Sequence, residues 1–134
     1  RWRPAALKQA SPASPDVPVY SEFMGVKLGM SANEVRQKLS EPKNKSDLQD
    51  FFVLSDSQTA QIVYDKEGNV TTISVDSTKD STAPTPESVI GEPVQPRPDG
   101  SVYHLKRYAA AGYWVAYSRT AGDNPIVTVT MQRM

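Results

Sequence analysis

The sequence predicts an α+β fold of two helix-plus-three-strand repeats, with the short helices packed on one face of an antiparallel sheet. Two observations predict the helices: apolar residues recur at helical spacing after Ser31, and again after Thr85. A third observation predicts the strands. Each helical stretch ends at Glu-Pro, and three segments with apolar residues between turn-forming residues come next. The pattern therefore indicates helix, strand, strand, strand, twice over.

The first predicted helix begins at Ser31. Ser31 and Glu34 have the spacing of a capping box, in which each side chain accepts a hydrogen bond from the other residue's backbone N–H. Val35 and Leu39 are four positions apart and form one apolar face. Pro42 cannot continue a helix, so the helix is expected to end before it.

The second predicted helix is shorter. Thr85 is a suitable N-cap, and Pro86 occupies the first helical position, where its missing N–H costs nothing. Val89 and Ile90 are expected to face the core, and Gly91 to end the helix.

The strands are predicted from apolar segments and from the turns between them. The turn sequences DKEGN, RPDGS and TAGDNP contain the Gly, Pro, Asn and Asp residues that favour reversal of the chain. The six predicted strands cover, approximately, residues 50–55, 60–65, 70–76, 101–108, 112–119 and 126–132. Pro42 and Pro93 hold equivalent places after the two helices, which supports an internal duplication.

Two regions differ in composition. Residues 1–19 contain four prolines among Ala and Ser, which is typical of a flexible tether. Residues 20–134 are expected to form a single compact domain of two similar halves, about 20–80 and 81–134. The chain starts with the basic residues RWR, which indicates that a signal or anchor segment originally preceded residue 1. The alternative is that residue 1 is an arbitrary starting point within a cytosolic protein.

Composition argues against several function classes. The 15 basic and 15 acidic residues balance, whereas proteins that neutralise many nucleic-acid phosphates carry a cationic excess. Without cysteine there is no disulfide, thiol nucleophile, cysteine-bound zinc or iron–sulfur cluster. His104 is the single imidazole, and no common catalytic or nucleotide-binding motif occurs. We therefore expect no catalytic residues, no metal and no cofactor.

Carboxylates are frequent in the first half, and two of them could in principle act as an acid–base pair. Because lysines alternate with them in segments that resemble loops, a solvated surface is the preferred interpretation. The residues concerned are Asp47, Asp50, Asp56, Asp65 and Glu67.

The stretch GVKLGMSANEVRQKLSEP, residues 25–42, resembles the opening of the SmpA/OmlA family of bacterial envelope lipoproteins and of the wider beta-lactamase-inhibitor-protein-like fold. Modules of this kind begin with a glycine, an apolar pair and GM-Ser/Thr, and their short helix ends at Leu-Gly-x-Pro. Ser40 stands where the family usually has glycine, and Ile90-Gly91-Glu92-Pro93 matches that helix end more closely. The resemblance implies an α+β module that binds other proteins at the cell envelope.

Aromatic residues are concentrated in the second half, and Tyr, Trp and Arg are the types that dominate protein–protein hot spots. Strand alternation places Tyr113 and Tyr117 on one sheet face and Trp114 on the other, and one of these sets must lie on an uncovered face. The alternative is that these aromatic residues complete the core. The candidate partner-binding residues are Trp114, Tyr103, Tyr113, Tyr117, Arg107 and Asp99.

The sequence thus predicts a non-catalytic protein-binding module of the bacterial envelope, periplasm or secreted space, with another protein as partner and no nucleic acid. One alternative is an inhibitor of a secreted or periplasmic hydrolase, in which Asp99 of the turn RPDGS enters an active site. Another is a small-ligand-binding domain whose pocket is built from the aromatic residues and His104.

Overall fold

The structure, a computed structural model, describes residues 18–78 and 83–134. Both helices in these ranges are short, whereas six of the strands have seven or eight residues. The elements in chain order are α2 (Ala32–Leu39), β1 (Asn44–Lys45), β2 (Gln49–Ser55), β3 (Gln58–Tyr64), β4 (Val70–Ser77), α3 (Pro86–Ile90), β5 (Val102–Tyr108), β6 (Tyr113–Arg119) and β7 (Val127–Arg133).

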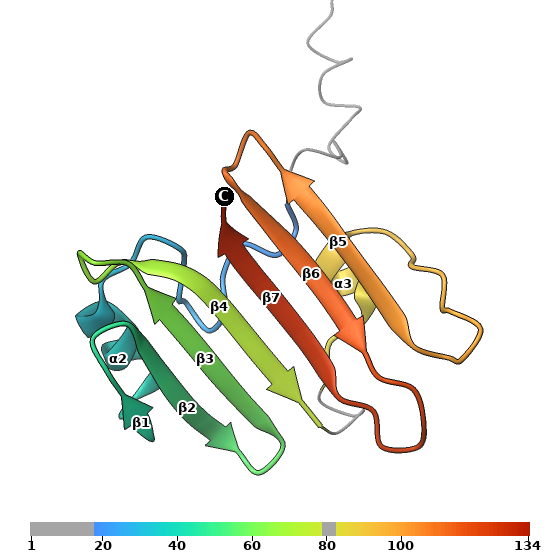
Figure 1. Ribbon diagram of the computed structural model, residues 1–134, viewed down its shortest axis with the longest axis horizontal. Helices are drawn as coiled ribbons and strands as arrows, with labels where there is room; N and C mark the ends of the chain where they lie inside the picture. Colours follow the sequence, from blue (N-terminus) through green and yellow to red (C-terminus); the bar gives the residue numbers. More distant parts are fainter. Residues whose placement is uncertain (1–17, 79–82) are drawn as a thin grey trace, which may run out of the picture.

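A single antiparallel sheet dominates the described chain (Figure 1). Its seven strands lie in the order β1-β2-β3-β4-β7-β6-β5. β4 and β7 pair from Thr72 opposite Gln132 to Ser77 opposite Val127, so the strands of the first and second halves join without interruption. The last strand of the chain therefore lies in the middle of the sheet, beside β4.

The predicted α+β fold of two helix-plus-three-strand repeats is wrong, because this is a mostly β fold. The helices have only 8 and 5 residues and do not form a layer comparable with the sheet. β1 is a fourth strand before α3, where the repeat predicted three. The hydrogen-bonded pair of β4 and β7 joins the strands of both predicted repeats into one sheet. Alternation within strands is local, whereas pairing between distant strands is not, which is why the sequence did not show this.

The predicted helix ends are confirmed. The Ser31 hydroxyl accepts from the backbone N–H of Glu34, and the Glu34 carboxylate accepts in return from the N–H of Ser31. Thr85 caps α3 in the same position, with Pro86 next to it, and Gly91 ends the helix at φ 90°. Ser40 ends α2 with φ 76° and ψ −160°, a region that only glycine enters without strain.

The predicted strands agree with β2 to β7 to within two residues at each end. Side chains alternate between buried and exposed along β2, for example, because one face of the sheet is covered and the other is not. β1 was not predicted, since two exposed residues carry no periodic signal.

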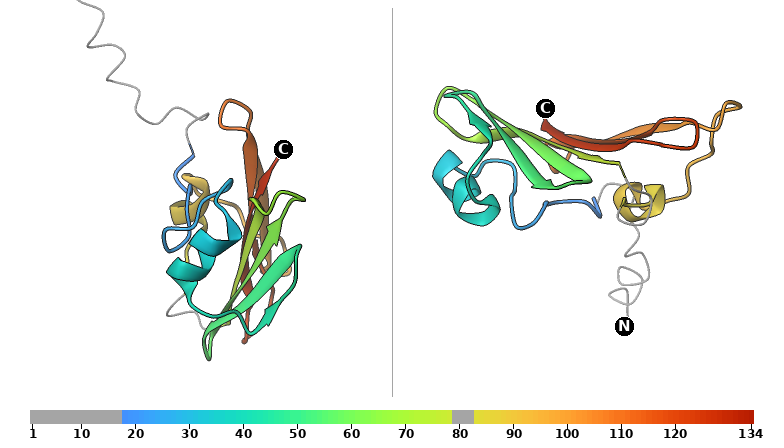
Figure 2. Two further views of the ribbon diagram at one scale, coloured as in Figure 1. Left: turned by 90° about the vertical axis from the view of Figure 1, so that its left-hand side faces the viewer. Right: turned by 90° about the horizontal axis from the view of Figure 1, so that it is seen from below.

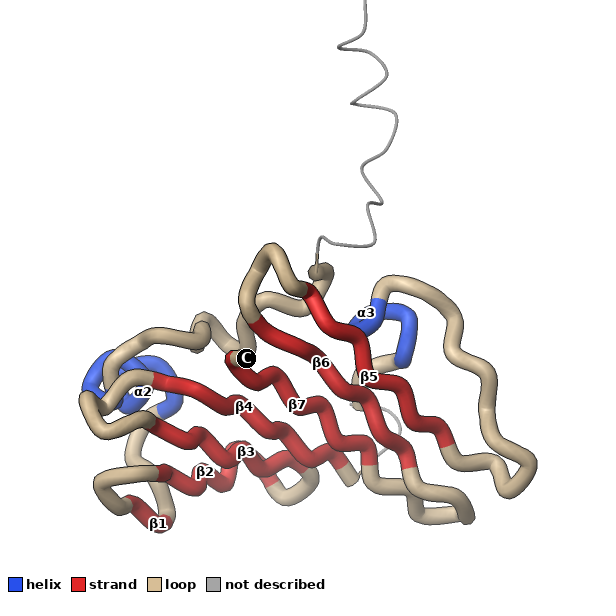
Figure 3. Tube along the Cα trace, turned by 45° about the horizontal axis from the view of Figure 1, so that its top comes forward, coloured by secondary structure: helices blue, strands red, loops and turns tan. Residues whose placement is uncertain are grey.

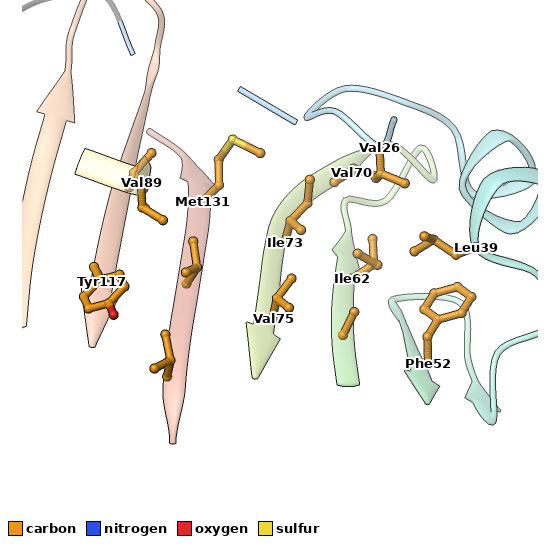
Figure 4. Packing of buried hydrophobic residues seen from close by; sticks show 14 of the residues in the cluster. Val26, Leu39, Phe52, Ile62, Val70, Ile73, Val75, Val89, Tyr117 and Met131 are labelled. Carbon is orange, nitrogen blue, oxygen red and sulfur yellow. The ribbon is translucent and has the colours of Figure 1, made fainter. Parts of the chain in front are cut away.

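Both helices and the segment before α2 lie on the same side of the sheet (Figure 2; Figure 3 shows the sheet and the helices along the Cα trace). The core lies between them and the sheet, where Val35 and Leu39 of α2 and Val89 and Ile90 of α3 are buried. Figure 4 labels Leu39 and Val89 among the buried side chains. The opposite side of the sheet carries no helix or strand of the described chain. Within those residues, no helix combines the length and apolar character needed to cross a membrane.

The predicted tether at residues 1–19 lies outside the described residues except for its last two positions. The expected boundary between the two halves, near residue 80, also falls in an undescribed segment, residues 79–82.

Candidate functional site: the open face of the sheet

The open face is the side of the sheet opposite the helices, and the strand registers arrange its side chains in three rows across six strands. From β5 to β2, the first row is Arg107, Trp114, Gln132, Thr72, Val63 and Gln49. The second row is Leu105, Ala116, Thr130, Ser74, Gln61 and Phe51. The third row is Tyr103, Ser118, Thr128, Asp76, Thr59 and Val53.

Three of the predicted binding residues lie along the β5–β6 side of this face, two of them in its first row and one in its third. Arg107 lies directly opposite Trp114 in the β5–β6 pair, and Tyr103 lies on the same face of β5, four positions from Arg107. The Tyr103 side chain is 48% exposed, and the guanidinium carbon of Arg97 lies 5.5 Å from the centre of its ring. This cation–π interaction between Arg97 and the Tyr103 ring is attractive and helps to orient the ring.

The other two predicted tyrosines lie on the covered side. Tyr117 is 1% exposed and donates a hydrogen bond of 3.0 Å to the carbonyl oxygen of Pro84. Tyr113 donates to the carbonyl oxygen of Tyr20 at 3.1 Å, and its ring centre is 6.0 Å from that of Tyr108. The structure thus separates Tyr113 and Tyr117 from the open face and places them against the core.

Asp99 lies in an exposed turn that leads into β5. Its carboxylate accepts from the backbone N–H of Ser101 at 2.9 Å and from the Ser101 hydroxyl at 2.7 Å. These bonds, the one from the hydroxyl most of all, hold the pKa of Asp99 below its usual range. The backbone N–H of Arg97 donates to the carbonyl of Ser101, which closes the turn beside Tyr103.

The middle of the open face is polar but almost uncharged. Hydroxyl and amide groups occupy most positions, and Arg107 and Asp76 are the two charged residues among the three rows. The Thr128 hydroxyl donates to Asp76 at 2.7 Å, and the Gln61 side-chain amide donates to that of Gln49 at 2.9 Å. The side chains are therefore ordered by bonds within the face.

The far end of the open face, on β2, is apolar, and sequence reasoning missed it. Phe51 is 37% exposed and Val53 is 51% exposed. The signal was present in the segment QDFFVLS, where strict alternation places Phe51 and Val53 together on the face opposite buried Phe52.

No family model, curated protein or solved structure matches this chain. The geometry of the open face is therefore the principal basis for inferring a function.

His104 and the buried Asp50 do not lie on this face. His104 lies on the covered side of β5, where its Nε2 is 3.8 Å from Oε1 of Glu92. The other carboxylate oxygen of Glu92, Oε2, lies 3.7 Å from the Lys106 ammonium. Within residues 18–78 and 83–134, no three His, Cys, Asp or Glu side chains come together in a way that could hold a metal ion.

One acidic residue departs from the expected solvated surface. Asp50 is fully buried, and its carboxylate accepts from Arg36 and from the Tyr64 hydroxyl. The hydrogen bond between Arg36 and the Asp50 carboxylate raises the pKa of Arg36. Burial, and in addition the hydrogen bond to Asp50, raises the pKa of Tyr64. The expectation was wrong for Asp50 because the residue shares the inward face of β2 with Phe52.

Proposed function

We propose that this chain is a non-catalytic module that binds another protein through the open face, in the bacterial envelope or the secreted space. The observation that carries the proposal is that Trp114, Arg107 and Tyr103 all lie on the β5–β6 side of a sheet face that no helix or strand of the described chain covers.

The chemistry of the face favours a protein partner. Trp, Tyr and Arg contribute most of the binding free energy in many interfaces, and Trp114, Tyr103 and Arg107 supply one of each. Neutral hydroxyl and amide groups in the middle are less costly to desolvate than charged groups. A nucleic acid would require a cationic surface, whereas Arg107 is the one cation in the three rows.

The size of the face also suits a protein. The six strands have seven or eight residues each. With a spacing of about 4.8 Å between strands and a rise of about 3.3 Å per residue, they give roughly 650 Å² of flat area. A standard interface buries about 800 Å² on each partner, so the open face offers most of one side of such an interface.

The resemblance of residues 25–42 to envelope lipoproteins supports the proposed location. It also supports a protein partner, because modules of that kind bind other proteins at the envelope.

The test uses a photo-crosslinking amino acid, p-benzoylphenylalanine, in the full chain expressed in its own organism. It replaces Tyr103 on the open face or, as a matched control, Met24 on the covered side, since these side chains are 48% and 58% exposed. We expect a defined crosslinked protein from position 103, absent from position 24 and lost when Trp114→Ala is added. Equal products from both positions, or a product that survives Trp114→Ala, would contradict the proposal.

A second candidate is inhibition of a secreted hydrolase by the turn at residues 97–101. Its support is the preorganised geometry of this exposed turn, because a loop already held by internal hydrogen bonds loses little entropy on binding. Micromolar protein is expected to slow at least one enzyme in a panel of beta-lactamases and proteases. Asp99→Ala should remove the inhibition, while Asp123→Ala, in another exposed turn, should keep it; an unaffected panel counts against this candidate.

A further inference from the structure

A cleft of about 570 Å³ lies on the covered side of the sheet, away from the open face. It is formed where the segment 21–29, the turn between β5 and β6, and the end of β7 meet. Ligand pockets in proteins usually have about 300 to 1,000 Å³, so the size suits a small molecule. We call it the Met131 cleft, after the fully buried methionine in its lining.

Hydrogen bonds fix the walls of the Met131 cleft. The Tyr113 hydroxyl holds the carbonyl of Tyr20 at one end of the segment, and the N–H of Gly29 donates to the carbonyl of Val70 at 2.8 Å at the other. The N–H of Met134 donates to the carbonyl of Gly112 at 2.9 Å, which joins the end of β7 to the β5–β6 turn. These bonds hold the three segments that line the cleft in fixed positions relative to one another.

The lining is apolar inside and cationic outside. Met131 is fully buried, and Leu28 and Tyr113 are partly buried against the core (Figure 4 shows Met131 projecting from β7). Lys27 and Arg133 are more exposed and supply two positive charges, and the lining contains no Asp or Glu.

The two cations differ in their surroundings. An Arg133 Nη atom lies 3.2 Å from a carboxylate oxygen of Asp65, which anchors this side chain. Within the described part of the chain, no carboxylate lies within ion-pair distance of the Lys27 ammonium. Of the two cations at this cleft, Lys27 is therefore the one whose ammonium group is available to pair with an anionic ligand.

We propose that the Met131 cleft binds a small amphipathic anion, with a flat or short apolar body against Met131 and Tyr113 and a carboxylate, sulfonate or phosphate group at Lys27. This site goes beyond the protein-binding function proposed above and does not depend on it, because its lining shares no residue with the open face.

The first experiment compares two fluorescent probes of nearly the same shape. Anilinonaphthalene sulfonate carries a negative charge, whereas N-phenylnaphthylamine is neutral. In the full chain, we expect saturable binding of the sulfonate at one site per chain, with weaker binding of the neutral probe. Binding of both with equal affinity, or no saturable binding of the sulfonate up to millimolar concentration, would overturn the proposal.

Two variants test the position of the anion. Lys27→Gln should weaken sulfonate binding about three- to fivefold, the effect of losing one partly exposed charge pair, and leave the neutral probe unchanged. Lys66→Gln removes an exposed lysine that does not line the cleft and is the matched control. Equal loss in both variants would show a general charge effect and overturn the assignment.

The methionines give an independent readout of location. The chain has four, of which Met131 and Met134 line the cleft and Met24 and Met30 do not. In a spectrum of methyl-labelled methionine, the sulfonate should shift the signals of Met131 and Met134 well beyond those of Met24 and Met30. The same shifts at all four, or shifts confined to Met24 and Met30, would overturn the proposal even if the probe binds.

Discussion

The Arg36 guanidinium donates two hydrogen bonds of 2.9 Å to the two carboxylate oxygens of Asp50, whose side chain has no exposed surface. The pair joins α2 to β2, and the Tyr64 hydroxyl adds a third bond of 2.7 Å from β3. A carboxylate with these three donors is well satisfied, and Arg36 keeps 29% of its side-chain surface in water.

We expect Asp50→Ala to lower the free energy of unfolding by about 3 kcal/mol, because it leaves Arg36 and Tyr64 without their acceptor. This is the lower end of the range for buried pairs, since Arg36 remains partly hydrated. Asp47→Ala, at an exposed loop position, should change stability by no more than about 0.5 kcal/mol. Urea unfolding measures both; an equally small effect at Asp50 would contradict a structural role for the pair.

Ser40→Gly should raise the free energy of unfolding by about 1 kcal/mol. The backbone of Ser40 has φ 76° and ψ −160°, which strains any residue with a Cβ atom and suits glycine. Ser40→Ala keeps the Cβ atom and should stay within about 0.5 kcal/mol of the natural chain. The idea fails if alanine and glycine have the same effect in thermal or urea unfolding.

The two faces of the sheet predict different effects of the same chemical change. Tyr117→Phe removes the hydrogen bond to Pro84 from a residue that is 1% exposed, so it should cost about 1 kcal/mol of stability. Tyr103→Phe, on the open face, should cost almost nothing. Unfolding curves recorded side by side distinguish them, and a larger loss at Tyr103 would show that the faces are assigned the wrong way round.

Stability should fall as the pH rises above 10. Burial raises the pKa of Tyr20 to about 12 and also raises the pKa values of Tyr64, Tyr108 and Tyr113. The unfolded chain loses these tyrosine protons near pH 10, whereas the folded chain retains them to higher pH. Because the folded state then binds more protons than the unfolded state, the free energy of unfolding falls as the pH rises. Each such group can contribute a slope of about 1.4 kcal/mol per pH unit.

Urea unfolding at pH 9, 10 and 11 measures this slope, and Tyr64→Phe isolates one group from the lysines that titrate in the same range. The variant should show a shallower decline than the natural chain. Parallel declines in the two proteins would show that Tyr64 does not contribute.

Part of the open face could be predicted from the sequence. Alternation in β6 separates Trp114 from Tyr113 and Tyr117 without any knowledge of the fold, and the structure confirms that separation. The sequence did not reveal which set is uncovered, because that depends on where α2 and α3 pack. The alternation of lysines with the carboxylates favoured a solvated Asp50, whereas Asp50 lies two positions before Phe52 and shares its buried face.

The local elements could be predicted from the sequence alone: the capping box at Ser31 and Glu34, the end of α3 at Gly91, and the ends of β2 to β7 to within two residues. These features depend on dihedral preferences and on hydrogen bonds between residues close along the chain. The pairing of β4 with β7, and the minor share of the helices in a mostly β fold, became visible in the folded molecule and not in the local pattern. The tertiary structure also brought the segment 21–29 to the end of β7 to form the Met131 cleft. Contacts of this kind join residues far apart in the chain, and no local pattern specifies them.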